Sequence, residues 1–452
     1  MTRRLLAVLL SVLPALAAGQ GVRVSGVSSA QLVELRPLVV DSAGVERSGA
    51  LVNAAPFLQD FTLAAWGLAQ GLSFHANARV RTQLASDGLV YPGANDRFDL
   101  LDAYAELERS WGRARLGRQW VMGGLGAYDF DGASLVLRRG RLSAEGWGGR
   151  ALAAGLFESH TSAELAAVES RPPDQDGYVA GGRVRLRPGP RSTMTLQYQR
   201  VLVADRSGLY SERAAFDASH QANGAVVDLA LAYDFAGAAW NEVRARLGTA
   251  KLSGVGYSVE VRHSRPFFEL WTIWGAFAPV GFDEARATVD WRPRATAVSF
   301  GLHGGYRRYG ESNAGLDLRT NGWRAGADAS WFGEGALSLS GSYDVDIGFG
   351  ASRSDGRARV RWTSPSGATI GVEGSALQNI YEFRLGTGRV FGAAVDGAVS
   401  LSSDVRFVCD AGVYRHARSN GALGPDWTQR RASARLEWTL GRDPGVVRGK
   451  AP

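Results

Sequence analysis

The chain has 452 residues, a formal net charge of +7, a hydrophobic content of 45% and a single cysteine, Cys409. One cysteine excludes an internal disulfide and a cysteine-rich metal site. The positive charge is almost entirely arginine and is spread along the chain, not gathered in one patch, which argues against a nucleic-acid-binding protein.

The N-terminus predicts export. Arg3 and Arg4 precede an apolar run over residues 5–16, and small residues follow at 15–19. This order is typical of a cleavable signal peptide, and the apolar run is too short to span a membrane as a helix. Beyond it there is no apolar run of about 18 residues or more, so no transmembrane helix is expected.

After the signal, short segments alternate between apolar and polar residues. A first segment over Val22–Leu38 alternates loosely, and a hairpin follows across Gln70–Gly71. Side chains change face at every residue of a strand, so this period of two predicts strands with one apolar and one polar face. The pattern continues to the end of the chain, and the polar face repeatedly carries arginine.

The clearest example lies between Phe98 and Leu137. Its first strand places one set of residues on an apolar face, namely Leu101, Ala103, Ala105 and Leu107. The opposite face carries Asp102, Tyr104, Glu106 and Glu108. After a turn at Ser110–Gly112, Arg113 and Arg115 alternate with Ala114 and Leu116. Paired acidic and basic strands predict cross-strand ion pairs along one face of a hairpin.

A family resemblance rests on the same stretch. The matching residues are Ala103, Tyr104, Leu107, Gly117, Arg118, Gln119, Phe130, Asp131 and Gly132. Around them the chain resembles outer-membrane porins of the alginate-export and related porin-like β-barrel families. The resemblance implies a porin-like barrel and, by analogy, anionic saccharides as solutes. Arg118 has the parity of Leu116 and Trp120, so either Gly117 marks a bulge that switches the face or Arg118 lies at an interface end.

The connections alternate in length. Short turns separate strands at one end, and longer polar loops are expected near 84–96, 155–175, 205–222, 310–319 and 417–427. This asymmetry is typical of outer-membrane barrels. We therefore predict an all-β fold, a transmembrane antiparallel up-and-down β-barrel of about 22 strands, with a range of about 18 to 22. The expected divisions are a signal peptide over 1–19, the barrel over 20–440 and a periplasmic tail over 441–452.

A soluble exported β-protein is the alternative fold. It is disfavoured because a packed core could not hold so many ions, since each desolvated charge costs several kcal/mol unless it is well paired. A closed barrel satisfies every backbone group in lipid. Aromatic residues near predicted strand ends suit interfacial girdles. These are Trp291, Trp323, Trp331, Tyr343, Trp362 and Trp438.

The expected function is passive diffusion through an aqueous pore, because a barrel of this size is too wide to be filled by side chains. Arginine rings favour anions. The predicted pore-lining residues are Arg79, Arg81, Asp102, Tyr104, Glu106, Arg113, Arg115, Arg183, Arg185, Arg187, Arg244, Arg246, Arg357, Arg359, Arg361, Arg431 and Arg435. Alternatively, these arginines pair with acids and only solvate the wall. Those acids include Glu108, Glu242, Glu260, Glu284, Asp290, Asp328 and Glu437.

Two other functions stay open. In a structural or adhesive barrel, the stretch 39–58 or the loop 155–175 would fold inward and plug the lumen. In an outer-membrane enzyme, a serine and a histidine would pair on the outer strand surface, although no local motif supports it. His160 and His220 are expected in exposed loops, and Gly123, Gly124 and Gly126 in a turn.

The expected partners are outer-membrane lipid, small hydrophilic solutes and the barrel-assembly machinery, with no nucleic acid. No cofactor and no metal are expected, because the histidines form no close metal-ligand pair. The oligomeric state stays open.

Overall fold

The computed structural model describes residues 21–36, 38–40, 46–84, 97–152, 177–203, 209–249, 254–265, 281–293, 296–310, 320–333, 336–348, 351–382, 388–418 and 426–441. The strands of the first half are β1 (Gly21–Leu35), β2 (Leu38–Val40), β3 (Glu46–Ser48), β4 (Val52–Ala54), β5 (Pro56–Ala69), β6 (Leu72–Gln83), β7 (Arg97–Arg109), β8 (Gly112–Gly123), β9 (Gly126–Arg139), β10 (Leu142–Ala151), β11 (Gly177–Gly189), β12 (Ser192–Val203) and β13 (Leu209–Ala222).

The strands of the second half are β14 (Ala225–Asp234), β15 (Ala239–Thr249), β16 (Val255–Ser264), β17 (Phe282–Trp291), β18 (Val298–Tyr309), β19 (Asn321–Phe332), β20 (Leu337–Ile347), β21 (Ala351–Thr363), β22 (Thr369–Glu382), β23 (Gly388–Ser400), β24 (Val405–Arg418) and β25 (Trp427–Gly441). No helix among the described residues is long and apolar enough to span a membrane.

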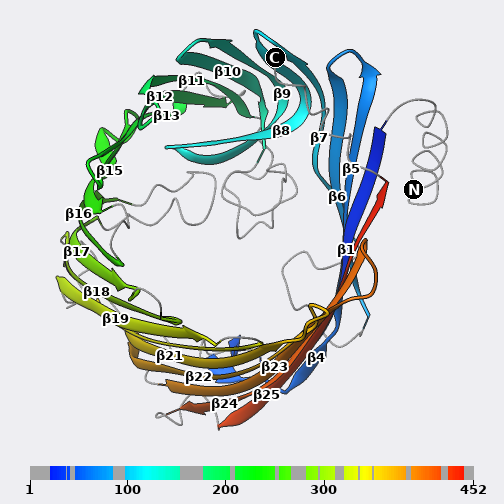
Figure 1. The fold of residues 1–452 in the computed structure, drawn as a ribbon, viewed down its shortest axis with the longest axis vertical. Helices are drawn as coiled ribbons and strands as arrows, with labels where there is room; N and C mark the ends of the chain where they lie inside the picture. The colour runs from blue at the N-terminus through cyan, green and yellow to red at the C-terminus, as the bar shows by residue number, and fades with distance from the viewer. Residues whose placement is uncertain are drawn as a thin grey trace.

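The long strands form one closed antiparallel barrel (Figure 1). Each strand from β5 to β25 pairs with its neighbours in sequence, and β1 closes the ring by pairing with both β25 and β5. The short β4 precedes β5 on the same side of β1, with only Ala55 between them, so the two act as one wall strand. The described residues therefore make a barrel of 22 strands, which confirms the predicted fold class.

The short turns lie at one end of the barrel, which we call the turn end, and the longer connections leave from the other, the loop end. The strand count agrees with the prediction, but one loop does not. Residues 209–222 form β13, which pairs with β12 and β14, and only 204–208 separate β12 from β13. The polar residues of β13 obscured its alternation, because both of its faces carry polar side chains.

The apolar face of the strands points outward. Exposed valines, leucines and aromatic residues cover the outside of nearly every strand, as β16 illustrates with Val255, Tyr257, Val259 and Val261. Such a continuous exposed apolar belt is stable only against lipid. The six aromatic residues predicted for the girdles lie on this outer face by register, and five of them are exposed.

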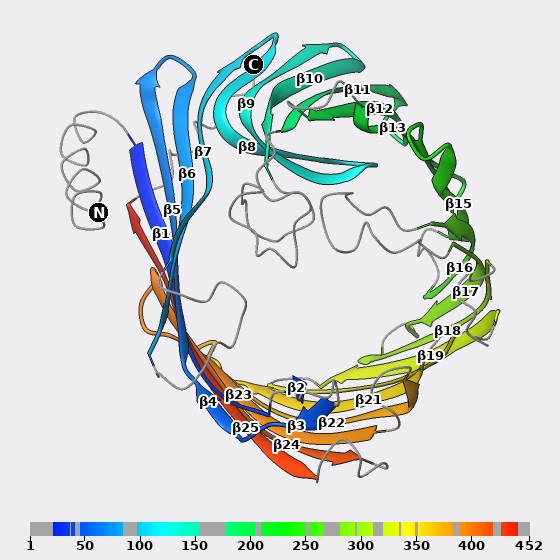
Figure 2. The same cartoon turned by 180° about the vertical axis from the view of Figure 1, so that it is seen from behind.

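The predicted plug is not formed by the described part of 39–58. Val52–Ala54 pair with the end of β1, and the chain then enters β5, so this part belongs to the wall. In the two opposite views down the barrel, β2 and β3 lie over the ring near β21 and β22, outside its open centre (Figure 2). The loop 155–175, the signal peptide and the C-terminal tail lie outside the described residues.

Candidate functional site: the inward hairpin and the arginine wall

One hairpin leaves the ring and folds into the barrel. The halves of β8 and β9 that are nearest to their connecting turn lie inside the ring in both views (Figures 1 and 2). Their turn at Gly124–Leu125 reaches the wall formed by β11 to β14. There Arg183 donates a hydrogen bond to the carbonyl of Met122, and Leu125 packs with Ala215 and Ala232. The hairpin therefore covers the inner face of these strands.

This packing identifies the inner face of the whole barrel. The registers of the strand pairs extend the face that contacts the hairpin around the ring, and outside the covered part this face is the polar one. All the arginines that we predicted to line a pore have this parity. The geometry thus places them on the inner wall; whether a passing solute contacts them stays a prediction.

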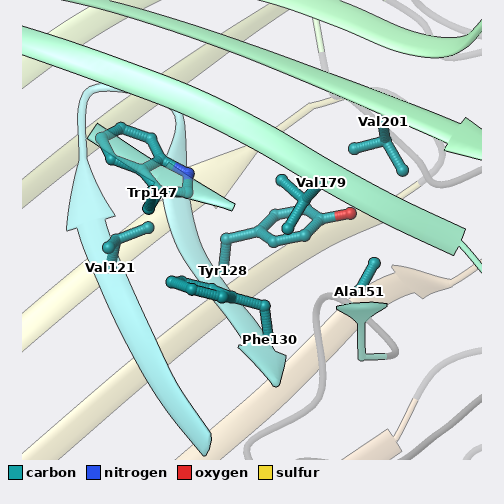
Figure 3. Packing of buried hydrophobic residues seen from close by; sticks show 7 residues of the cluster. All are labelled: Val121, Tyr128, Phe130, Trp147, Ala151, Val179 and Val201. Atoms are coloured by element: carbon teal, nitrogen blue, oxygen red, sulfur yellow. The ribbon is translucent and has the colours of Figure 1, made fainter. Parts of the chain in front are cut away.

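Under the hairpin the inner face carries an apolar cluster beside buried polar residues such as Gln197 and Gln199. Figure 3 shows the cluster formed by the hairpin residues Val121, Tyr128 and Phe130 with residues of the wall strands. The wall contributes Trp147, Ala151, Val179 and Val201. Phe130 and Val201 are fully buried, and a fully buried side chain of this kind contributes about 1.5–3 kcal/mol. The cluster therefore holds the hairpin against the wall.

Three glycines lie side by side where the hairpin bends. Gly132 of β9 pairs with Gly117 of β8 on one side and with Gly149 of β10 on the other. A Cβ on Gly132 would lie 2.1 Å from the carbonyl oxygen of Gly148, and Gly117 has a φ of +129°. Glycine in a strand permits such close backbone approach and sharp bending. This line of glycines forms the root of the hairpin.

The other residues of the family resemblance fasten the same root. Arg118 donates to both carboxylate oxygens of Asp131, at 2.8 and 2.9 Å, and to the carbonyl of Leu100 at 2.9 Å. The buried Gln119 accepts a hydrogen bond from Ser134 at 2.6 Å and donates to the carbonyl of Gly132 at 3.0 Å. These residues thus surround the bend, whereas the sequence indicated only a strand pair.

Of the two explanations for the parity of Arg118, the bulge at Gly117 is wrong, and the position at an interface end stays a prediction. Pairing runs through Gly117 without a register shift, so no bulge switches the face there. Arg118 keeps the parity of Leu116 and faces its partner Asp131 on the neighbouring strand of the bend. The register shift lies instead in β7, where Leu100, not Leu101, pairs with Ala78. Leu101 is therefore the residue without a partner on β6.

Many predicted arginines pair with carboxylates on the inner wall. Arg81 lies 2.6 Å from Asp99, Arg115 lies 2.7 Å from Glu106, and Arg359 lies 2.5 Å from Asp396. Further pairs join Arg79 to Asp60, Arg183 to Glu145, Arg244 to Glu242, Arg357 to Asp355 and Arg435 to Glu437. For these arginines the geometry agrees with the alternative in which they pair with acids and only solvate the wall.

The aromatic Tyr104 joins one of these groups. Its ring lies 4.6 Å below the guanidinium of Arg115 and stacks on His75 at 5.2 Å. Asp102 accepts a hydrogen bond from Asn77 at 2.6 Å. Elsewhere on the inner wall, Arg431 of β25 lies 4.2 Å over the aromatic ring of Tyr414 on β24. These contacts orient inner-wall side chains without neutralising the arginines.

One group of arginines exceeds its carboxylates. A cavity of about 390 Å³ at the turn end of β8 to β11 is lined by Arg113, Arg138, Arg141, Arg183, Arg185 and Arg187, which we call the arginine cluster. Among the described residues Glu145 is the only acid in its lining, and it pairs with Arg183. Two acids outside the lining pair with further members, because Arg138 lies 2.5 Å from Glu108 and Arg113 lies 3.8 Å from Glu106. The Nε of Arg185 is buried without a hydrogen-bond partner. The cavity therefore has an excess of positive charge and unused donors.

A second cavity lies under the hairpin tip. It has a volume of about 460 Å³, and Met122, Gly123 and Gly124 form one side. Arg183 and Arg185 line both cavities, so the two adjoin. Arg244, Asp217 and Glu242 complete the charged lining of the second one. The predicted pore-lining set did not include Arg138 and Arg141, which flank the turn between β9 and β10, although the alternation places Arg141 on the polar face with Ser143 and Glu145.

The structure offers little for the enzymatic alternative. His220 lies on the outer face of β13, not in a loop, and its Nδ1 lies 2.7 Å from Ser192 Oγ. No carboxylate among the described residues contacts this histidine to complete a catalytic triad. Among the described residues there is also no group of three or more His, Cys, Asp or Glu side chains that could hold a metal ion.

No family model and no curated protein matches this sequence. Among solved structures, a variant of the ferric enterobactin receptor from Pseudomonas aeruginosa aligns with 92% of this chain and 80% of its own, at 11% identity and a TM-score of 0.54. OccK2 of P. aeruginosa aligns with 93% of this chain and 98% of its own, at 9% identity and a TM-score of 0.44. A BenF-like porin from Pseudomonas fluorescens aligns with 93% and 99%, at 11% identity and a TM-score of 0.41.

At these identities the likeness concerns the fold. The closed ring, the apolar outer belt and the polar inner wall define this chain as a β-barrel of the bacterial outer membrane, and the receptor at a TM-score of 0.54 shares this fold. The likeness does not single out the alginate-export family.

Proposed function

We propose that this barrel is a diffusion channel for small hydrophilic solutes and that it prefers anions. The arginine cluster is the observation that carries the proposal. Its six guanidinium groups face three carboxylates, those of Glu106, Glu108 and Glu145, and lie beside the hairpin that narrows this side of the lumen. Positive charge in a cleft with low-dielectric walls raises the local concentration of anions.

The finer solute class follows from guanidinium chemistry. Arginine binds carboxylate and phosphate through two parallel hydrogen bonds, and Arg185 has an unused buried donor in the wall. The resemblance to alginate-export porins points to acidic saccharides among the carboxylates. The residues that carry the resemblance lie at the root of the hairpin. They therefore stabilise the shape of the channel and do not select the solute.

Reversal potentials test the proposal. The refolded mature protein is placed in a planar bilayer with a salt gradient across it, and we expect a stable conductance with an anion-selective reversal potential. Exchanging Arg113, Arg185 and Arg187 for Gln should move the potential toward zero. A matched variant exchanges three outer-face arginines, Arg150, Arg200 and Arg308, and should leave the potential unchanged.

Two results would overturn the proposal. Folded protein without conductance favours the structural or adhesive barrel. An anion preference that both triple variants reduce equally would assign selectivity to the net charge of the protein and not to the arginine cluster. Oligouronates added to one side test the saccharide class, because they should block the current of the wild type and not that of the variant without Arg113, Arg185 and Arg187.

A further inference from the structure

Three arginines lie on the outer, lipid-facing side of neighbouring strands. Arg389 of β23, Arg415 of β24 and Arg430 of β25 are exposed near the loop end of the barrel. Arg415 pairs with Phe391, two residues from Arg389, and Arg430 pairs with Val413, two residues from Arg415. Diagonal neighbours of this kind are about 7–8 Å apart, within reach of long side chains. We call them the outer arginine triad.

The triad has more positive than negative charge. Arg415 lies 3.8 Å from Asp426, and Arg430 lies 3.6 Å from Glu34, whose carboxylate also accepts a hydrogen bond from the backbone N–H of Arg430 at 2.8 Å. The side chains of Arg415 and Arg430 are 71% and 75% exposed, so these pairs are weak. Arg389 lies opposite Gln378 and Ala417, and no carboxylate faces it in the described part of the chain.

Other outer-face arginines at the loop end differ. Arg200 lies opposite Glu212, and Arg308 lies opposite Asp283. Each therefore faces an acid on the next strand, directly across the pair. The excess charge on β23 to β25 is a local property of this sector and not a general feature of the rim.

An apolar groove begins at the triad. It has a volume of about 740 Å³ and includes Arg430 and Glu34 in its lining. Its apolar lining on the outer face includes Leu32, Val372, Val395, Val413, Ala411 and Ala432. Alanines on the central strands between bulkier valines and leucine make this part of the outer surface hollow. A flexible hydrocarbon chain fits such a hollow, because water is excluded from a lipid-facing surface.

We propose that this face binds a phosphorylated lipid of the outer leaflet. Its phosphate groups bind the outer arginine triad, and one acyl chain lies in the groove. The longer connections leave from the same end of the barrel, which in outer-membrane barrels is the extracellular end. Guanidinium groups bind phosphate through paired, charge-assisted hydrogen bonds, and basic groups at a membrane surface recruit anionic headgroups. The proposal does not depend on channel activity.

Native mass spectrometry of the detergent-solubilised protein tests it. The probe is an acylated glucosamine disaccharide with two phosphates, and the reference is the same lipid without phosphates. We expect the wild type to retain the phosphorylated lipid at least tenfold better than the reference. The double variant Arg389→Gln, Arg415→Gln keeps the Arg430–Glu34 pair and should lose most of this preference.

The matched control removes the same charge elsewhere. The variant Arg200→Gln, Arg308→Gln changes two outer-face arginines at the same end and should retain the lipid like the wild type. Ala411→Trp fills the groove and should weaken binding of the acylated lipid while the arginines stay in place. Each variant is checked for the slower unfolded band on an unheated against a heated gel, so that loss of folding is recognised.

Four results would overturn the proposal. The first is equal retention of both lipids by the wild type, and the second is an equal loss of lipid retention in both double variants. The third is displacement of the lipid by inorganic phosphate alone, which indicates a free-phosphate site. The fourth is a dimer that forms in the wild type and is lost in the Arg389→Gln, Arg415→Gln variant. It would assign this face to a second copy of the chain.

Discussion

The two sides of this barrel use the same strand pattern differently. Strands β16 to β25, the plain sector, have an inner face of polar and charged residues, and no apolar side chain is buried among their described residues. Strands β8 to β14, the folded-over sector, bury Val121, Tyr128, Phe130, Val179 and Val201 inside the ring. Among the described residues of these two sectors, apolar side chains are therefore buried on the inner face only where the hairpin covers it.

The largest expected effect concerns this buried cluster. Phe130→Ala removes a fully buried ring and should lower the free energy of unfolding by about 3–5 kcal/mol. Phe300→Ala in the plain sector is the control, because its ring is exposed on the outer face and should cost much less. Denaturant unfolding in lipid vesicles measures both. Equal losses would mean that the cluster does not hold the hairpin.

The bend itself gives the next effect. Gly132→Ala places a Cβ against the backbone of Gly148 and should cost about 1–3 kcal/mol, with a higher single-channel conductance if the hairpin moves away from the wall. Gly374→Ala in the plain sector meets no atom within 4 Å and should change neither quantity. The bend would be dispensable if both variants gave the wild-type conductance.

The sequence predicts the plain sector well and the folded-over sector only in part. The alternation around Arg357, Arg359 and Arg361 needs only the strand period, and the structure keeps it. The sequence does not predict the inward hairpin. Alternation shows which residues of a strand share a face, but it does not show whether a pair of strands stays in the barrel wall. Gly117 and Gly132 belong to the family resemblance, but their role in the bend depends on Gly149. This glycine becomes a neighbour of Gly132 only in the folded sheet.

A smaller difference in stability is expected between ion pairs of the two sectors, namely Arg118 with Asp131 at the root of the hairpin and Arg406 with Glu437 in the plain sector. A double-mutant cycle of Arg118→Gln and Asp131→Asn should give a coupling of about 1 kcal/mol, reduced because Asp131 is 37% exposed. The pair of Arg406 and Glu437 in the plain sector has one contact at 3.5 Å and should give a coupling near zero. A coupling at Arg406 as large as that at Arg118 would contradict a special role for the bidentate pair.

The smallest expected effect is a difference in reversal potential when two arginines are removed from one sector or from the other. Removing Arg185 and Arg187 should shift the reversal potential more than removing Arg357 and Arg361, although each double variant removes two charges from the inner wall. The first pair lines a cavity beside the hairpin, whereas Arg357 is 61% exposed, where water and salt screen its field. Screening acts over about 8 Å at physiological ionic strength and lengthens to about 30 Å at 0.01 M. The difference between the two variants should therefore shrink in dilute salt, and a difference independent of salt would mean that solutes bind the arginines directly.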